Sequence, residues 1–234
     1  MRLPRERRGR QRGARLLWKP MAGTSPPASL VLVHGAGSGP WVFDGWAGAF
    51  PSLAVVAVDL QSGLDVAEAS MDDYARKVVT AAGALPPPVA LCGWSMGGLV
   101  VLQAAHEVRP HSVVLLEASA PAEIQGHHSD VALLTGVFDP EAEYGAFPAG
   151  IRARPESLLA RAQRRRGIAI PGLPCPSLVI AGAAFANDRG RALADVYQST
   201  FAEFPELQHF DLVLDAAPRQ AIAAFLGVSS GPTA

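Results

Sequence analysis

Six short apolar runs, separated by stretches of helical pattern, constrain the fold of this chain more than any other feature of its sequence. Each run is continuous rather than alternating and is bounded by Gly, Pro or Ser, which is typical of strands buried on both faces of a sheet. The runs are residues 29–35, 53–60, 89–95, 112–119, 176–182 and, with a weaker pattern, 202–207. Residues 15–19, RLLWK, are expected to add an edge strand.

Segments with a helical pattern lie between these runs. They are residues 70–85, 96–108, 156–167, 189–200 and 217–227. The first begins with Ser70, a favourable N-cap, and has two aspartates in its first turn, where negative charge complements the helix dipole. Strands that alternate with helices predict an α/β fold, with a mostly parallel central sheet and helices on both faces.

The interval of about 120–170 breaks this alternation with turns rich in Pro and Gly. An insertion between two strands at the carboxyl edge of a sheet predicts a short helical lid, here with an apolar character that favours a modest apolar substrate group. With 234 residues, of which 49% are hydrophobic, the chain can bury one large core. We therefore expect one domain over residues 14–227, followed by a flexible tail at 228–234.

Charge is distributed unevenly along the chain. Residues 1–15 hold seven arginines and one glutamate, while the formal net charge of the whole chain is −1. We predict that residues 1–13 form a disordered basic extension and that neither nucleic acid nor a membrane is a partner. Met21 resembles a natural start, so residues 1–20 are expected to be dispensable. The two cysteines form no metal-type pair, which favours a reducing cytoplasm, and we expect a monomer or a homodimer.

The segment GWSMG, residues 93–97, has the pattern Gly-x-Ser-x-Gly between a buried run and a helical one. In this setting the glycines permit a very tight turn, and the serine takes a strained backbone conformation that exposes its hydroxyl at the helix N-terminus. The pattern alone occurs widely by chance, but the strand–turn–helix context is specific. Ser95 is therefore our candidate nucleophile.

A second glycine-rich segment, LVHGAGSGPW, spans residues 32–41. Acyl transfer requires backbone N–H donors directed at the developing oxyanion, and we expect these from Ala36 and Met96. A phosphate-binding loop is the competing interpretation, but the segment lacks both Gly-Lys-Ser/Thr and the Gly-x-Gly-x-x-Gly spacing. We interpret His34 as a structural residue that braces the loop.

The motifs VLVHGAGSGPW, VVAVDL, LCGWSMGG and ELQHFDLVLDAAPRQAIAAFLG together resemble the α/β-hydrolase superfamily, over roughly residues 28–227. His-Gly followed shortly by Trp is similar to the esterase and hydroxynitrile-lyase branch. The resemblance implies an α/β-hydrolase fold and a catalytic histidine between the last strand and the final helix. Of the six histidines, only His209 has that position.

The catalytic acid is harder to locate. The family usually places it in a Gly-x-x-Asp pattern after the penultimate strand, but the matching residue after Gly182 is Phe185. Asp188 lies three residues later in the same loop, and we predict that it orients His209. Glu117, at the end of another predicted strand, is the alternative, because some members of the superfamily carry the acid there. A site without a functional acid is the third interpretation.

These residues predict a serine hydrolase that cleaves a small apolar carboxylic ester, thioester or lactone through an acyl-enzyme, without a metal or an organic cofactor. A lyase or C–C hydrolase that uses the same base is one alternative. A non-catalytic ligand-binding module is another, and it is favoured only by the displaced acid. We expect Trp41 and Trp94 to line the mouth of the substrate pocket, with a plain core role as the alternative.

Overall fold

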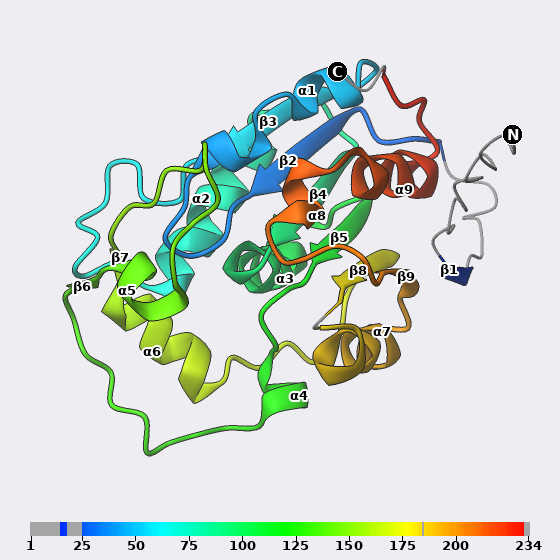
Figure 1. The fold of residues 1–234 in the computed structure, drawn as a ribbon. Coiled ribbons are helices and arrows are strands. Elements are labelled where there is room, and N and C mark those ends of the chain that lie inside the picture. The colour runs from blue at the N-terminus through cyan, green and yellow to red at the C-terminus, as the bar shows by residue number, and fades with distance from the viewer. Residues whose placement is uncertain (1–14, 18–24, 184, 232–234) are drawn as a thin grey trace, which may run out of the picture.

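The computed structural model describes residues 15–17, 25–183 and 185–231. In this part of the chain seven strands form one sheet, in the order β1-β9-β8-β5-β4-β2-β3 (Figure 1). All neighbouring strands pair in parallel except β1, which is antiparallel to β9. The predicted α/β fold with a mostly parallel sheet is confirmed. The strands are β1 Arg15–Leu17, β2 Ser29–Val33, β3 Ala54–Val58, β4 Val89–Trp94, β5 Ser112–Leu116, β8 Ser177–Gly182 and β9 Thr200–Phe204.

The continuous apolar runs are explained by two cores, one on each face of the sheet. Successive side chains of a strand point to opposite faces. Val31 and Leu91 therefore pack into one core, while their neighbours Leu30 and Cys92 pack into the other. A strand buried on both sides needs no polar alternation.

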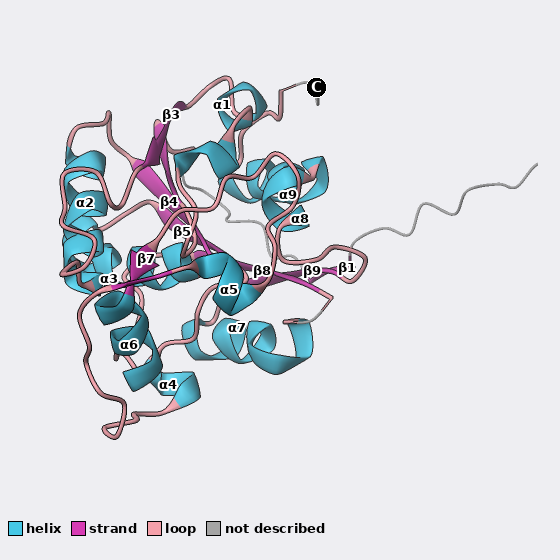
Figure 2. Cartoon of the chain, turned by 60° about the vertical axis from the view of Figure 1, so that its left-hand side comes forward, coloured by secondary structure: helices cyan, strands magenta, loops and turns pink. Residues whose placement is uncertain are grey.

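Helices cover both faces, as Figure 2 shows with the sheet seen nearly edge-on. The helices on one face are α2 Met71–Gly83, α3 Met96–Val108 and α7 Arg191–Tyr197. Those on the other are η1 Pro40–Phe43, α1 Trp46–Ala49, α8 Asp211–Leu214 and α9 Ala216–Leu226.

Two elements differ from the sequence-based expectation. The run 53–60 contains β3, which is an edge strand rather than a fully buried one, and Val56 remains 38% exposed. The predicted helix 189–200 ends at Tyr197, because Gln198 takes a left-handed conformation with φ of 51° and β9 begins soon afterwards. The pairing of β1 with β9 gives residues 15–17 the edge strand that was expected there, and the dispensability of residues 1–20 stays a prediction.

The insertion between β5 and β8 lies against the loop that follows β2. The Arg154 N–H donates to the Gly37 carbonyl oxygen at 2.9 Å, and the Trp41 indole N–H donates to the Arg152 carbonyl oxygen at 2.9 Å. The insertion therefore covers part of the carboxyl edge of the sheet, where a lid was expected. Its elements are α4 Ala122–Gln125, β6 Val137–Phe138, α5 Pro140–Tyr144, β7 Glu156–Ser157 and α6 Leu158–Arg166, with β6 and β7 paired antiparallel.

The predicted basic extension, residues 1–13, lies outside the described residues. The flexibility predicted for the tail at 228–234 stays a prediction, although the Gly231 N–H donates to the Ala49 carbonyl oxygen at 3.0 Å. None of the described helices is both long and apolar enough to cross a bilayer.

The N-terminus of α2 provides a test of the local sequence analysis. Ser70 and Asp73 form a capping box, in which the Asp73 N–H donates to the Ser70 Oγ at 3.1 Å and the Ser70 N–H donates to an Asp73 carboxylate oxygen at 2.9 Å. We expect Ser70→Ala to lower the free energy of unfolding by about 1 kcal/mol in urea denaturation. Thr80→Ala, at an exposed position of the same helix, is the control, and an equal loss there would contradict the capping role.

Candidate active site

Ser95 lies in a tight turn between β4 and α3. Its backbone has φ of 55° and ψ of −120°, which is unusual for a residue other than glycine. The Ser95 N–H donates to the Leu116 carbonyl oxygen, and the Ser95 carbonyl oxygen accepts from the Ser119 N–H, both at 2.9 Å. The turn is therefore held at the carboxyl end of the neighbouring strand β5.

Close backbone packing requires the two glycines of Gly-x-Ser-x-Gly. A Cβ atom on Gly93 would lie 2.2 Å from the Gly97 carbonyl oxygen. A Cβ atom on Gly97 would lie 2.2 Å from the Val33 carbonyl oxygen on β2. In both cases the obstacle is backbone, so larger residues would push α3 away from the sheet and move Ser95.

His209 contacts a carboxylate, and that carboxylate belongs to Glu117. The loop between β9 and α8 carries His209, whose Nδ1 lies 2.6 Å from Glu117 Oε2. The other carboxylate oxygen, Oε1, accepts from the Gly182 N–H at 2.7 Å. The Glu117 side chain is only 1% exposed, and its backbone has φ of 40°. Glu117 is thus held on both oxygens, away from water.

The predicted contact between Asp188 and His209 is wrong. After β8 the chain forms η2, Ala186–Gly190, and the Asp188 side chain is 64% exposed. Its carboxylate pairs with the neighbouring Arg189 at 3.1 Å instead. The residue at the usual acid position, Phe185, stacks on the imidazole of His209 with ring centroids 5.5 Å apart and planes 17° apart. An aromatic contact therefore occupies the place where the sequence pattern would put a carboxylate.

Trp94 is only 2% exposed and packs against His209, which agrees with the core role that was the alternative to a place at the pocket mouth. Its indole N–H donates to the His209 carbonyl oxygen at 3.0 Å, and the ring centroids of Trp94 and His209 lie 4.8 Å apart. Trp41 is partly exposed and lies under the guanidinium of Arg152, 4.1 Å from the ring centroid. The pocket role of Trp41 stays a prediction.

The loop after β2 passes directly beside Ser95. A Cβ atom on Gly35 would lie 2.9 Å from the Ser95 Cβ atom. Within the described residues, the N–H groups of Ala36 and Met96 donate to no backbone carbonyl. Met96 follows Ser95 in the chain and Ala36 follows Gly35, so both amides belong to residues next to this close contact, and their role as oxyanion donors stays a prediction.

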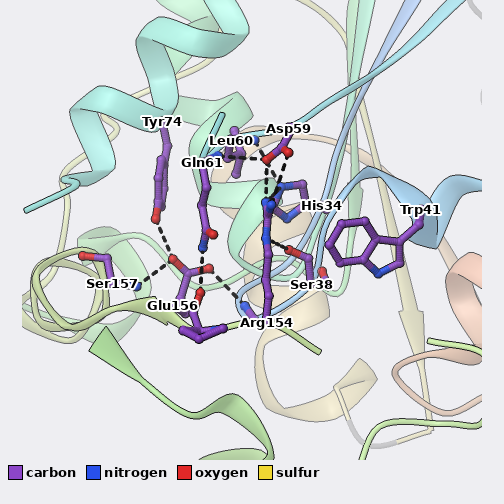
Figure 3. A network of polar contacts seen from close by, with 12 residues as sticks. His34, Ser38, Trp41, Asp59, Leu60, Gln61, Tyr74, Arg154, Glu156 and Ser157 are labelled. Atoms are coloured by element: carbon purple, nitrogen blue, oxygen red, sulfur yellow. Dashed lines mark hydrogen bonds and ion pairs between the residues drawn. The ribbon is translucent and has the colours of Figure 1, made fainter. Parts of the chain in front are cut away.

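Residues from the insertion brace this loop, as Figure 3 shows. The Gly37 N–H donates to Glu156 Oε2 at 3.0 Å, and the Arg154 guanidinium donates through Nε to the Ser38 carbonyl oxygen at 2.8 Å. Glu156 is fully buried, and its other oxygen accepts from the Tyr74 hydroxyl at 2.5 Å. No local sequence pattern marks Tyr74, Arg154 or Glu156, because long-range contacts alone reveal this role.

His34 has the structural role expected from the sequence. Its Nδ1 lies 2.9 Å from the Gly35 carbonyl oxygen, to which it donates, while Nε2 accepts from the Leu60 N–H and from Arg154 Nη2, both at 3.2 Å. A second proton on Nε2 would face two donors. Burial lowers the pKa of His34 from 6.5 to about 4, and the nearby Arg154 charge also lowers it.

Comparison with known families agrees with this fold, because the model of the alpha/beta hydrolase family matches residues 30–226. The chain belongs to the α/β-hydrolase family. Among solved structures, this α/β-hydrolase resembles the type II thioesterase BorB from the borrelidin biosynthetic cluster, with 23% identity, a TM-score of 0.62, and coverage of 93% of this chain and 97% of that one. At these identities, likeness to a solved structure establishes the fold alone.

Two other hydrolases have similar structures. The RedJ thioesterase from the prodiginine pathway of Streptomyces coelicolor has 21% identity and a TM-score of 0.61, and the match covers 89% of this chain and 96% of that one. Polyneuridine aldehyde esterase has 17% identity and a TM-score of 0.58, with coverage of 86% and 98%. A comparison with curated protein sequences returns no significant match.

The lowered pKa of His34 predicts acid lability. Between pH 6.5 and about 4 the unfolded chain binds a proton at this residue and the folded chain does not. The free energy of unfolding should therefore fall as the pH drops through this window, by about 3 kcal/mol from His34. Urea denaturation across the window should show a flatter pH dependence for His34→Asn than for the wild type. The control is His106→Asn, at an exposed histidine, and an unchanged slope in His34→Asn would contradict the prediction.

Proposed function

We propose that this α/β-hydrolase cleaves a small carboxylic ester, thioester or lactone, with Ser95 as nucleophile, His209 as general base and Glu117 as the acid that orients it. The contact of 2.6 Å between His209 Nδ1 and Glu117 Oε2 carries the proposal. It joins the histidine of the family's motif order to a buried carboxylate at the edge of the sheet where Ser95 lies. A base that is held in this way has the relay geometry of serine hydrolases.

In the proposed reaction, the Ser95 oxygen attacks the substrate carbonyl carbon while His209 Nε2 takes the hydroxyl proton. The N–H groups of Ala36 and Met96 stabilise the oxyanion that develops on the carbonyl oxygen. As the tetrahedral intermediate collapses, the imidazolium returns the proton to the leaving alkoxide or thiolate. Water then attacks the acyl-enzyme with His209 again as the base, which releases the carboxylic acid and restores Ser95.

Glu117 suits the role that the sequence analysis gave to Asp188. Its negative charge lies beside the imidazolium that forms during the reaction, and its acceptance of the Nδ1 proton leaves Nε2 free to act as the base. The Gly182 N–H holds the second oxygen at 2.7 Å, so the carboxylate cannot rotate freely. A Cβ atom on Gly182 would lie 2.4 Å from the Leu207 carbonyl oxygen and 2.7 Å from Glu117 Oε1, which explains the glycine at this position.

The non-catalytic alternative loses the feature that favoured it. A binding module was suggested only by the displaced acid, and Glu117 supplies a carboxylate to His209. The names of the structural neighbours, two thioesterases and an esterase, support the ester and thioester classes. Among the contacts of the described residues, none favours a lyase or a C–C hydrolase.

Removal of the carboxylate charge tests the acid. We expect Glu117→Gln to lower kcat/KM on a short p-nitrophenyl ester by at least about 100-fold, because the imidazolium loses its counter-charge; the matching change in a serine-protease triad lowers kcat by about 10⁴-fold. Asp188→Asn is the matched control, and we expect it to stay within about twofold of the wild type. A large loss in Asp188→Asn with little loss in Glu117→Gln would reverse the assignment.

Replacement of the nucleophile tests the reaction class. Ser95→Ala should abolish labelling by a fluorophosphonate and lower ester turnover by about 10⁴-fold or more. Its melting temperature should stay close to that of the wild type, because alanine keeps the Cβ atom and therefore the same backbone strain at φ of 55°. A variant that keeps a tenth of the wild-type activity would contradict a serine-hydrolase mechanism.

A further inference from the structure

A cavity of about 360 Å³ with a strongly basic wall opens between the insertion and the carboxyl end of β5. Arg161, Arg164 and Arg165 of α6 line it, together with Arg189 of η2. The one acidic side chain in its wall is Glu143 of α5. A chain with a formal net charge of −1 thus concentrates positive charge around one hollow.

The cavity adjoins the candidate active site through two contacts. Ser119 lines it, and the Ser119 N–H donates to the Ser95 carbonyl oxygen at 2.9 Å. On another side, the guanidinium of Arg189 lies 4.6 Å from the ring centroid of Phe185, which stacks on His209. A molecule that reacts at Ser95 could therefore extend into the basic hollow.

The guanidinium of Arg164 has unused hydrogen-bonding capacity. Its Nη1 and Nη2 atoms lie 3.4 Å from the hydroxyl oxygens of Ser119 and Tyr144, at the long limit of a hydrogen bond. Its Nε is buried without an acceptor among the described residues. Because a molecule in the cavity cannot reach the buried Nε, the donors that Arg164 offers to an anion are Nη1 and Nη2, whose present partners are distant.

The other arginines of α6 differ in whether a carboxylate neutralises their charge. Arg161 pairs with Glu143, whereas Arg165 is exposed and pairs with no carboxylate within the described residues. Basic residues in the last turn of a helix also complement the helix dipole. The helix dipole is a sufficient reason for an arginine at position 166, where the side chain is exposed and does not line the cavity. It does not explain why Arg164 has an Nε that is buried without an acceptor among the described residues.

We propose that this cavity is an anion-binding subsite, which holds a phosphate or carboxylate group that the substrate carries away from its scissile bond. Guanidinium groups bind both anions through paired charge-assisted hydrogen bonds. The cavity holds about ten times the liquid volume of a water molecule, so it accommodates the anion together with part of the chain that bears it. The inference rests on the proposed function, because it makes the preferred ester or thioester an anionic one.

Two pairs of substrates distinguish the phosphate from the carboxylate source. The first compares butyryl-coenzyme A with S-butyryl-N-acetylcysteamine, which lacks the phosphates. The second compares the p-nitrophenyl monoester of glutaric acid with neutral p-nitrophenyl butyrate. Arg164→Gln and Arg165→Gln are the test variants, and Arg166→Gln, on the same helix but outside the cavity, is the matched control.

We expect Arg164→Gln to lower kcat/KM at least about tenfold for one of the two anionic substrates, Arg165→Gln to lower it less, and neither to change the neutral partner more than about twofold. Arg166→Gln should leave all four substrates unchanged. The preference for the anionic substrate should weaken as salt rises. Equal losses on the neutral and anionic members of a pair would overturn the inference, since they would indicate a structural role.

Direct binding separates this inference from the proposed function. Isothermal titration of the wild-type protein with inorganic pyrophosphate and with glutarate should show binding of at least one, weakened at least about tenfold in Arg164→Gln and unchanged in Arg166→Gln. Binding without ester turnover or fluorophosphonate labelling would leave the anion site standing and overturn the hydrolase. Turnover of neutral esters without binding of either anion, and without a preference for either anionic substrate, would overturn the anion site alone.

Discussion

The parallel register of β4, β5 and β8 is the constraint on which the candidate site depends. Trp94, Leu116 and Ile180 lie level across the three strands. Ser95 follows Trp94 and donates its N–H to the Leu116 carbonyl oxygen. In the same way, Glu117 follows Leu116 and donates its N–H to the Ile180 carbonyl oxygen. Both Ser95 and Glu117 have a positive φ. Both residues therefore lie at one edge of the sheet, and strand pairing rather than a mobile loop places Ser95 and Glu117.

The second constraint couples the insertion to the chemistry. The loop that carries Ala36 is hydrogen-bonded to residues far along the chain. Arg154 lies 116 residues after its partner Ser38, and Glu156 lies 119 residues after its partner Gly37. A buried carboxylate that accepts from Tyr74 and from the Gly37 N–H fixes the direction of the loop amides. The same insertion supplies Arg161, Arg164 and Arg165 of the basic cavity, whereas Arg189 comes from η2. Loop stability and the proposed recognition of the substrate therefore depend on one segment.

The sequence predicts most of the fold, because continuous apolar runs and a good N-cap are local signals. Ser95 could be predicted because the two glycines of Gly-x-Ser-x-Gly mark a turn with close backbone packing. His209 could be predicted because no other histidine lies between the last strand and the final helix. Glu117 could only be an alternative, since which strand end faces His209 depends on the path of the loop after β8. Phe185 stacks on His209, and the π-helical turn η2 that follows leaves the Asp188 side chain exposed to solvent. No local sequence pattern predicts this path of the chain. Glu156 carries no signal apart from its long-range contacts.

The hydrogen bond between His209 and Glu117 is the central claim, and proton NMR tests it without any knowledge of the substrate. A proton in a short bond to a carboxylate resonates far downfield of the backbone amides, and His209→Ala identifies its signal. The account predicts that this signal is present in the wild-type protein, is lost in Glu117→Ala and persists unchanged in Asp188→Ala. A signal that survives in Glu117→Ala but disappears in Asp188→Ala would contradict the account.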